Sequence, residues 1–298
     1  MTSLHQYIAE EIATDHAEGL VSRREAMRRL ALLGVAAPAA TALLAACSSS
    51  NTSGGGTSTP AATSAASPPG MATAVPTAPI TFPGPNGTLQ AAWAAAAQPK
   101  GAVLVIHENK GLTDHIRSVA GRFAGIGYSA LAVDLLSAQG GTGAFKDQAE
   151  ATAALGKIPP TQFVSDLRAS LDELSRRAPI QKLGATGFCF GGGLVWLLLA
   201  QPEPRLTAAT PFYGPLPDHA DFTGDQAAVL AVYASEDARV GASRPAAEAA
   251  MTKAGLTHEV FVAQGAGHAF FNDTGPSYNA PAATQAWQKV TDWYGKHL

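Results

Sequence analysis

The sequence predicts an α/β fold in which a mainly parallel sheet is covered by helices on both faces. From about residue 80 onward, short apolar runs alternate with amphipathic segments of ten or more residues. That alternation is typical of strand–helix–strand units. The chain has 298 residues, 46% of them hydrophobic, which is enough to bury a large core.

The expected elements follow one another along the folded domain, residues 80–298. A hairpin with a turn at Asn86-Gly87 comes first and adds an antiparallel edge. The later apolar runs predict strands at residues 101–108, 128–136, 182–187, 207–213, 229–234 and 258–263. Helical spacing of apolar residues and flanking glycines predict helices at residues 114–125, 161–177, 192–200, 243–254 and 281–297.

Residues 1–47 are expected to form an export signal. No charged residue occurs from Leu30 through Pro99, and the apolar segment 30–46 follows the basic segment 22–29. That order is typical of secretory signals. Arg23-Arg24 resembles a twin-arginine motif, and residues 44–47 resemble a bacterial lipobox, whose Cys47 is acylated after cleavage.

Two other interpretations of the apolar segment are a buried helix and a permanent membrane span. The first lacks a polar face and would be interrupted by Pro38, and the second is slightly short. A cleaved lipoprotein signal is therefore favoured, with an uncleaved anchor as its main competitor. Either one places the protein outside the cytoplasm, tethered to the cell membrane.

Residues 48–79 are expected to be a disordered linker, because they are Ser, Thr, Gly, Ala and Pro with almost nothing large to bury. Such a composition cannot offset the entropy of ordering a chain. The sequence thus predicts a disordered leader and linker ahead of the folded domain. The net charge of -3 leaves no basic footprint of the kind that nucleic-acid binders carry.

The segment Gly-Phe-Cys-Phe-Gly-Gly, residues 187–192, lies between a predicted strand and a predicted helix. A nucleophile flanked by glycines at such a junction is typical of a nucleophile elbow, here with Cys189 at its centre. The positive end of the helix favours a thiolate, and the Phe190 N–H would form one half of an oxyanion hole. The competing interpretation is a cysteine in a plain packed turn.

Two further residues supply partners for Cys189 in the chain order nucleophile, acid, base. Asp237 follows one predicted strand and His268 follows the next. His268 would act as general base and acid, and Asp237 would hold its tautomer. The alternatives are a helix cap for Asp237 and a solvated loop position for His268.

With these motifs in place, the chain resembles the dienelactone hydrolase family over nearly all of residues 80–298. The matching segments are VIHENKGLTDHIR, AVDLLS, GFCFGG, YASEDARV and GAGHAFFND, in the family's order. The resemblance implies an α/β-hydrolase fold, a triad of Cys189, His268 and Asp237, and cleavage of a small-molecule lactone or carboxylic ester, like a carboxymethylenebutenolidase. It implies no cofactor, and no metal motif is found: Gly111 stands where H-E-x-x-H needs its second histidine.

The resemblance also implies that Glu108 contacts the resting thiol and controls its ionisation, and that the Asn109 N–H is the second oxyanion donor. One family feature is missing. Asn272 follows His268 where members that hydrolyse dienelactone carry an arginine for the substrate carboxylate. The resemblance therefore still implies ester or lactone hydrolysis, but it does not identify the substrate.

Two other functions compete with hydrolysis. One is an inactive surface lipoprotein that uses the fold for binding, although a pure binder would need none of the expected catalytic residues. The other is thiol redox chemistry at Cys189, which a missing resolving cysteine makes improbable.

Overall fold

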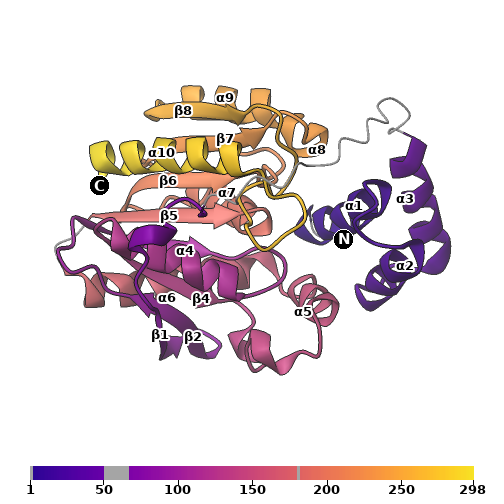
Figure 1. The fold of residues 1–298 in the computed structure, drawn as a ribbon, viewed down its shortest axis with the longest axis horizontal. Helices are drawn as coiled ribbons and strands as arrows, with labels where there is room; N and C mark the ends of the chain where they lie inside the picture. Colours follow the sequence, from indigo (N-terminus) through magenta and orange to yellow (C-terminus); the bar gives the residue numbers. More distant parts are fainter. Residues whose placement is uncertain (1–2, 50–66, 180–181) are drawn as a thin grey trace.

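The computed structural model describes residues 3–49, 67–179 and 182–298. One eight-stranded sheet, in the order β1-β2-β4-β3-β5-β6-β7-β8, runs through the body of the molecule (Figure 1). Its strands are β1 (Ala78–Gly84), β2 (Gly87–Ala94), β3 (Gly101–Ile106), β4 (Tyr128–Asp134), β5 (Leu183–Phe188), β6 (Leu206–Phe212), β7 (Ala228–Ala234) and β8 (His258–Ala263). β1 and β2 form an antiparallel edge, and β3 to β8 pair in parallel, which confirms the predicted fold class.

Helices cover both faces of this sheet. The helices of the body are α4 (Asp114–Gly125), α5 (Gln148–Leu155), α6 (Pro160–Arg177), α7 (Phe190–Leu199), α8 (Ala238–Gly241), α9 (Arg244–Lys253) and α10 (Ala280–His297). α4 and α10 share one face, where the Phe123 and Trp287 rings lie 5.0 Å apart. α6 and α7 share the other, joined by Phe163 and Phe190 at 5.3 Å (Figure 1).

The central strands are buried from end to end because helices cover both sides. Every residue of β3, β4, β5 and β7 is buried, so these strands are continuous apolar runs rather than alternating ones. α6 instead buries one stripe, with Leu167 and Leu171 inaccessible to solvent, and Pro160 lies in its first turn, where no N–H is needed.

Part of the predicted linker belongs to the folded body. Residues 67–79 pack against α4 and α10: the Val75 N–H donates to Gly121 O at 3.1 Å, and Gly70 lies against the Trp287 ring. β1 begins at Ala78, two residues before the expected boundary at residue 80, and the packed segment that leads into it is described from residue 67. Residues 50–66 of the linker lie outside the described residues.

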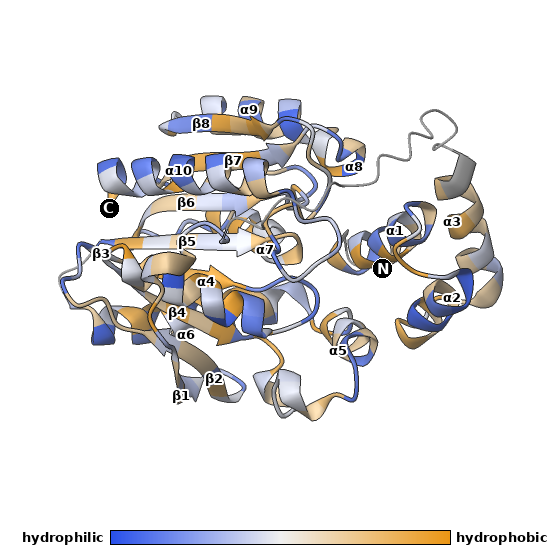
Figure 2. Cartoon of the chain, viewed as in Figure 1, coloured by the Kyte–Doolittle hydropathy of each residue, from blue (hydrophilic) through white to orange (hydrophobic). Residues whose placement is uncertain are grey.

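Residues 3–49, expected to be a disordered leader, form three helices: α1 (Ser3–Ala17), α2 (Arg23–Leu32) and α3 (Ala37–Ser49). They pack together through buried apolar residues that include Ile8, Ile12 and Leu30. The apolar segment 30–46 is divided between α2 and α3 at Gly34, whose φ is 89°. Figure 2 shows the difference between the two helices: α2 carries many hydrophilic residues, and α3 is mostly hydrophobic.

Within the described ranges, no helix combines the length and the apolar character that crossing a membrane requires. The three helices instead lie beside the body, at the end of the molecule where α7 begins (Figure 1). Arg28 of α2 donates to Asp147, the residue before α5, at 2.5 Å. The carboxyl ends of the strands and the N-terminal helices therefore meet at one place.

Candidate active site

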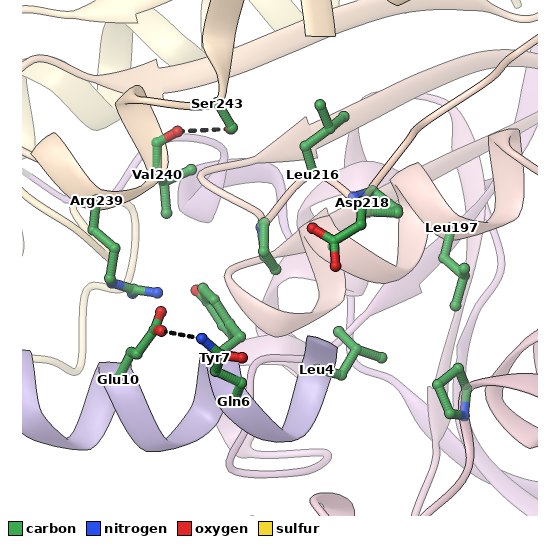
Figure 3. Close-up of a pocket in the computed structure, with 14 residues that line it drawn as sticks. Leu4, Gln6, Tyr7, Glu10, Leu197, Leu216, Asp218, Arg239, Val240 and Ser243 are labelled. Atoms are coloured by element: carbon green, nitrogen blue, oxygen red, sulfur yellow. Dashed lines mark hydrogen bonds between the residues drawn. The ribbon is translucent and has the colours of Figure 1, made fainter. Parts of the chain in front are cut away.

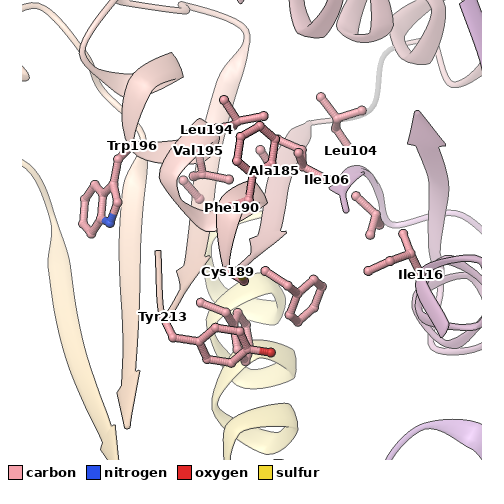
Figure 4. Packing of buried hydrophobic residues seen from close by; sticks show 14 of the residues in the cluster. Leu104, Ile106, Ile116, Ala185, Cys189, Phe190, Leu194, Val195, Trp196 and Tyr213 are labelled. Carbon is pink, nitrogen blue, oxygen red and sulfur yellow. The ribbon is translucent and has the colours of Figure 1, made fainter. Parts of the chain in front are cut away.

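Cys189 lies between β5 and α7 in a conformation that few side chains adopt. Its φ is 56° and its ψ is -118°, and its N–H donates to Phe212 O of the neighbouring strand at 3.0 Å. A positive φ at a residue other than glycine costs free energy and is characteristic of functional turns. The side chain is almost fully buried among aromatic and aliphatic residues (Figure 4).

The glycines around Cys189 are required by packing. A Cβ on Gly187 would lie 2.1 Å from Gly191 O, one on Gly191 would lie 2.4 Å from Ile106 O, and one on Gly192 would lie 2.4 Å from Phe212 O. The positive φ belongs to Cys189 and not to these glycines. Without a Cβ, these glycines let α7 approach the ends of β3 and β6.

His268 and Asp237 are joined by a short hydrogen bond. His268 Nδ1 lies 2.5 Å from Asp237 Oδ2, and the other oxygen, Oδ1, accepts from the Val240 N–H at the start of α8. The ligand atoms of His268 and Cys189, with a carboxylate oxygen of Glu11, all lie within 4.8 Å of one another. The chain thus brings the predicted nucleophile, base and acid together from the ends of β5, β7 and β8.

The charges of this group are mutually dependent. Burial alone would raise the pKa of Asp237, but the hydrogen bond and charge of His268, the Val240 N–H and the charge of Arg239 together hold that pKa below its usual value. Burial opposes protonation of His268, yet the Cys189 sulfur and the Asp237 carboxylate raise its pKa well above its usual value. Asp237 therefore stays ionised and favours a proton on the imidazole.

The predicted oxyanion donors are the backbone N–H groups of Phe190, next to Cys189 in the chain, and of Asn109, which lines the same pocket as Cys189. Phe190 is the first residue of α7, and Asn109 follows the end of β3, where its carbonyl accepts from Thr152 Oγ1 at 2.8 Å. Neither N–H has an acceptor within the part of the chain that the structure describes. Free backbone donors of this kind are the groups that stabilise an oxyanion.

Glu108 lies in the site, but its contact is with Asn272. Asn272 Nδ2 donates to Glu108 Oε2 at 2.7 Å, and Asn272 Oδ1 accepts from the Thr274 N–H at 3.0 Å. His107 Nε2 accepts from the Leu135 N–H, so its Nδ1 carries the proton and donates to the Glu108 carbonyl at 2.6 Å. This bond fixes the backbone of Glu108. The thiol contact expected of Glu108 is occupied in this structure by another carboxylate.

That carboxylate is Glu11, on α1. The Cys189 thiol donates to Glu11 Oε2 at 3.2 Å and to Oε1 at 3.3 Å, and Tyr7 Oη lies 3.5 Å from both Cys189 Sγ and His268 Nε2. Burial and the charge of Glu11 raise the pKa of Cys189 to about 11. Sequence reasoning missed both residues, because α1 was assigned to the leader and its only signal was an acidic, one-sided helix pattern.

A cavity of about 170 Å³ surrounds these groups. Its wall combines Cys189 and His268 with acidic side chains of α1 and the basic side chains of Lys110 and Arg29. Glu11, Cys189 and His268 are ligand types that can hold a divalent ion, but here all three use those atoms in hydrogen bonds. Asp134, at the end of β4, has a structural role: it accepts from the N–H groups of Leu136 and Thr142.

Comparisons with known proteins find relatives among the dienelactone hydrolases. A sequence model of the dienelactone hydrolase family matches residues 89–298. A protein of Methylorubrum extorquens named "Putative carboxymethylenebutenolidase" is 32% identical over 234 residues, which cover 73% of this chain and 80% of that protein. A Synechocystis protein of the same name is 33% identical over 250 residues, 76% of this chain and 100% of its own length.

Solved structures agree with the sequence relatives. A crystal structure from Klebsiella pneumoniae, described as a "Putative Dienelactone Hydrolase", superposes with a TM-score of 0.65 at 28% identity and covers 74% of this chain and 98% of its own. A dienelactone hydrolase from Anabaena variabilis gives 0.60 at 19% identity, which shows the fold. The family model begins after the three N-terminal helices, at residue 89.

Proposed function

Because the chain belongs to the dienelactone hydrolase family and is a lactone or carboxylic ester hydrolase, we propose that Cys189, His268 and Asp237 are its catalytic triad. The observation that carries this proposal is the short His268–Asp237 hydrogen bond beside a nucleophile at the N-terminus of α7. Such a bond fixes the imidazole so that Nε2 faces the thiol.

The reaction follows from these positions. His268 Nε2 takes the proton from the Cys189 thiol as the sulfur attacks the carbonyl carbon, and the Phe190 and Asn109 N–H groups stabilise the oxyanion. The C–O bond to the alcohol then breaks, and His268 gives that proton to the leaving oxygen. Water, deprotonated by His268, attacks the thioester and releases the acid together with the free thiol. Asp237 stabilises the imidazolium in both steps.

Asn272 bears on the substrate. Its amide is already used by Glu108 and by Thr274, so it offers no positive charge to a substrate carboxylate. We therefore propose a neutral small-molecule lactone or ester rather than dienelactone itself.

The test uses the purified full chain with p-nitrophenyl acetate and a panel of small lactones. Cys189→Ala should abolish turnover, whereas Cys47→Ala, which removes the other cysteine, should leave turnover unchanged. Equal turnover by wild type and Cys189→Ala would refute the triad. No turnover on any ester or lactone, by wild type or by Glu11→Ala, which removes the carboxylate beside the thiol, would favour the alternative, a surface protein that uses the fold for binding.

We also propose that the protein is exported and tethered to the membrane through a lipid on Cys47, or through an uncleaved signal. The twin-arginine-like pair and the lipobox-like residues before Cys47 support this proposal. Cell fractionation of Cys47→Ala tests it, because loss of the acylation site should release the protein from the membrane fraction. A variant that stays fully membrane-bound would show that no lipid on Cys47 holds it.

A further inference from the structure

Helix α1 reaches the catalytic pocket from outside the part of the chain that matches the family. Glu11 is one helical turn after Tyr7, so the two side chains project from one face of the helix toward Cys189. Tyr7, Glu11 and Cys189 are all buried. The contact joins residues that are 178 positions apart in the chain.

The Glu11 carboxylate occupies the place where a substrate's acyl group must lie. Both of its oxygens are within 3.3 Å of Cys189 Sγ, and Oε1 also accepts from Asn109 Nδ2 at 3.0 Å. A carboxylate is the product of ester hydrolysis, so the site holds a carboxylate of its own chain next to the nucleophile. With this group in place, no ester carbonyl can reach the sulfur.

Tyr7 secures the helix on the other side of the thiol. Its hydroxyl is 3.5 Å from His268 Nε2, and the Arg239 guanidinium lies 4.3 Å from the centre of its ring. Figure 3 shows Arg239 directed at the tyrosine, with Glu10 and Gln6 bonded to each other beside it. Nε and Nη1 of Arg239 have no hydrogen-bond acceptor among the described residues, and the aromatic ring packs against this half-buried cation.

We propose that α1 is an inhibitory segment of this chain, in which Glu11 occupies the acyl position and accepts the proton of the Cys189 thiol. The inference rests on the proposed function, because it takes Cys189 as the nucleophile. A group held on the same chain competes at an effective concentration in the millimolar range. Turnover by the full chain is therefore slow until α1 leaves the pocket.

Export would remove the inhibitor. All three N-terminal helices except the last residues of α3 precede Cys47, so cleavage at the lipobox-like site would separate Tyr7 and Glu11 from the body. The acidic residues Asp15 and Glu18 of the same segment would leave the pocket wall with them. The precursor would be inactive, and in the processed protein Cys189 would be accessible to substrate.

The protonation state of the thiol gives a measurement independent of turnover. The groups that face Cys189 are Glu11 and Tyr7 on α1, Glu108 after β3, Tyr213 after β6 and His268 after β8. Burial and Glu11 disfavour the thiolate most, and His268 favours it. Removing Glu11 takes away a negative charge and opens access to the sulfur.

The experiment compares full-length wild type, Glu11→Ala and Glu10→Ala. Alkylation of Cys189 by iodoacetamide is followed between pH 6 and 10 by mass spectrometry of the Cys189 peptide, which excludes Cys47. For Glu11→Ala we expect an apparent thiol pKa lower by about one unit, alkylation at pH 7.5 faster by about tenfold, and a higher kcat/KM on esters. Glu10→Ala, on the same helix but bonded to Gln6, should match wild type.

The outcomes separate the inference from the proposed function. Equal alkylation and equal turnover in Glu11→Ala and Glu10→Ala would overturn the inference, even if Cys189→Ala is inactive. Faster alkylation in Glu11→Ala with no ester cleaved by any variant would support the contact and refute the hydrolase mechanism. If Glu11→Ala loses its cooperative melting transition, Glu11→Gln, which keeps the side-chain volume, supplies the same comparison.

Discussion

Asp273 holds a buried arginine next to the loop that contains His268, and its replacement should be costly. The Arg122 side chain on α4 is fully buried, and its Nη2 donates to both Asp273 oxygens at 2.9 and 2.8 Å. His115 Nδ1 donates to the same carboxylate at 2.6 Å. Asp273 lies five residues after His268, so it fixes the loop that carries the proposed base.

The magnitude follows from the charges. Burial would raise the pKa of Asp273, but His115 and Arg122 outweigh it and hold that pKa at about 2, against an ordinary value of 3.8. A shift of this size corresponds to roughly 2 kcal/mol of stability at pH 7. Asp273→Asn also leaves the Arg122 charge buried without its partner, a situation that costs about 3–5 kcal/mol. Because Asn can still accept one hydrogen bond, we expect a loss of about 3 kcal/mol.

Urea unfolding at several pH values measures this loss. For a chain of this size, about 3 kcal/mol corresponds to a melting temperature lower by roughly 6–12 °C. The folded pKa is depressed, so the contribution is complete above the unfolded pKa of 3.8 and is lost as the pH falls toward about 2. The difference between wild type and Asp273→Asn should therefore be constant from pH 7 to 5 and shrink below pH 5.

The exposed Asp292, whose side chain accepts a hydrogen bond from Gln288 one helical turn away, offers a matched control. Asp292→Asn should change the free energy of unfolding by less than about 0.5 kcal/mol. A loss below about 1 kcal/mol in Asp273→Asn, or one that does not depend on pH between 5 and 3, would refute the reasoning.

Two further substitutions test the packing around the site. Gly191→Ala should destabilise the fold by about 2–3 kcal/mol in a thermal melt, because the new Cβ would meet two backbone carbonyl oxygens. The control Gly241→Ala should be neutral or stabilising in the same assay, because a Cβ at that position would meet no described residue beyond its own helix within 4 Å. Tyr294→Phe should lower the free energy of unfolding in urea by about 1 kcal/mol, because its buried hydroxyl bonds Thr186 and Thr210 at 2.5 and 2.9 Å. The loss stays small because the two threonines keep their own bond at 2.6 Å. A loss above about 3 kcal/mol would show that this bond does not compensate.

The sheet could be predicted from the sequence because its signal is local. The apolar runs at 128–136 and 229–234 are bounded by polar or small residues, and the strands form within one or two residues of the expected ends. The elbow could be predicted for the same reason, since glycines cluster around one cysteine. α5 was missed because its alanine-rich sequence has little amphipathic pattern, and the cap at Asp147 that starts it is a single residue.

The contacts of α1 could not be predicted, because they depend on tertiary structure. Nothing in the neighbourhood of Glu11 in the sequence indicates a thiol, and the basic and apolar residues that follow favour an export signal. The observed partner of Glu108, Asn272, could not be predicted for a similar reason. Whether the Glu108 carboxylate bonds Cys189 or Asn272 depends on which group lies beside the thiol, and here that group is Glu11. Local patterns specify which residues are at the site, and long-range packing decides which of them touch.

The spacing of Tyr7 and Glu11 offers a starting point for chemical probes. The helix presents a phenol and a carboxylate on one face, with Cβ atoms about 6 Å apart, one directed at a guanidinium and the other at a thiol. A small molecule whose scaffold attaches these two side chains at that Cβ spacing would reproduce the contacts without the helix. Replacing its carboxylate with an electrophile would turn it into a covalent label for Cys189 in the opened form of the protein.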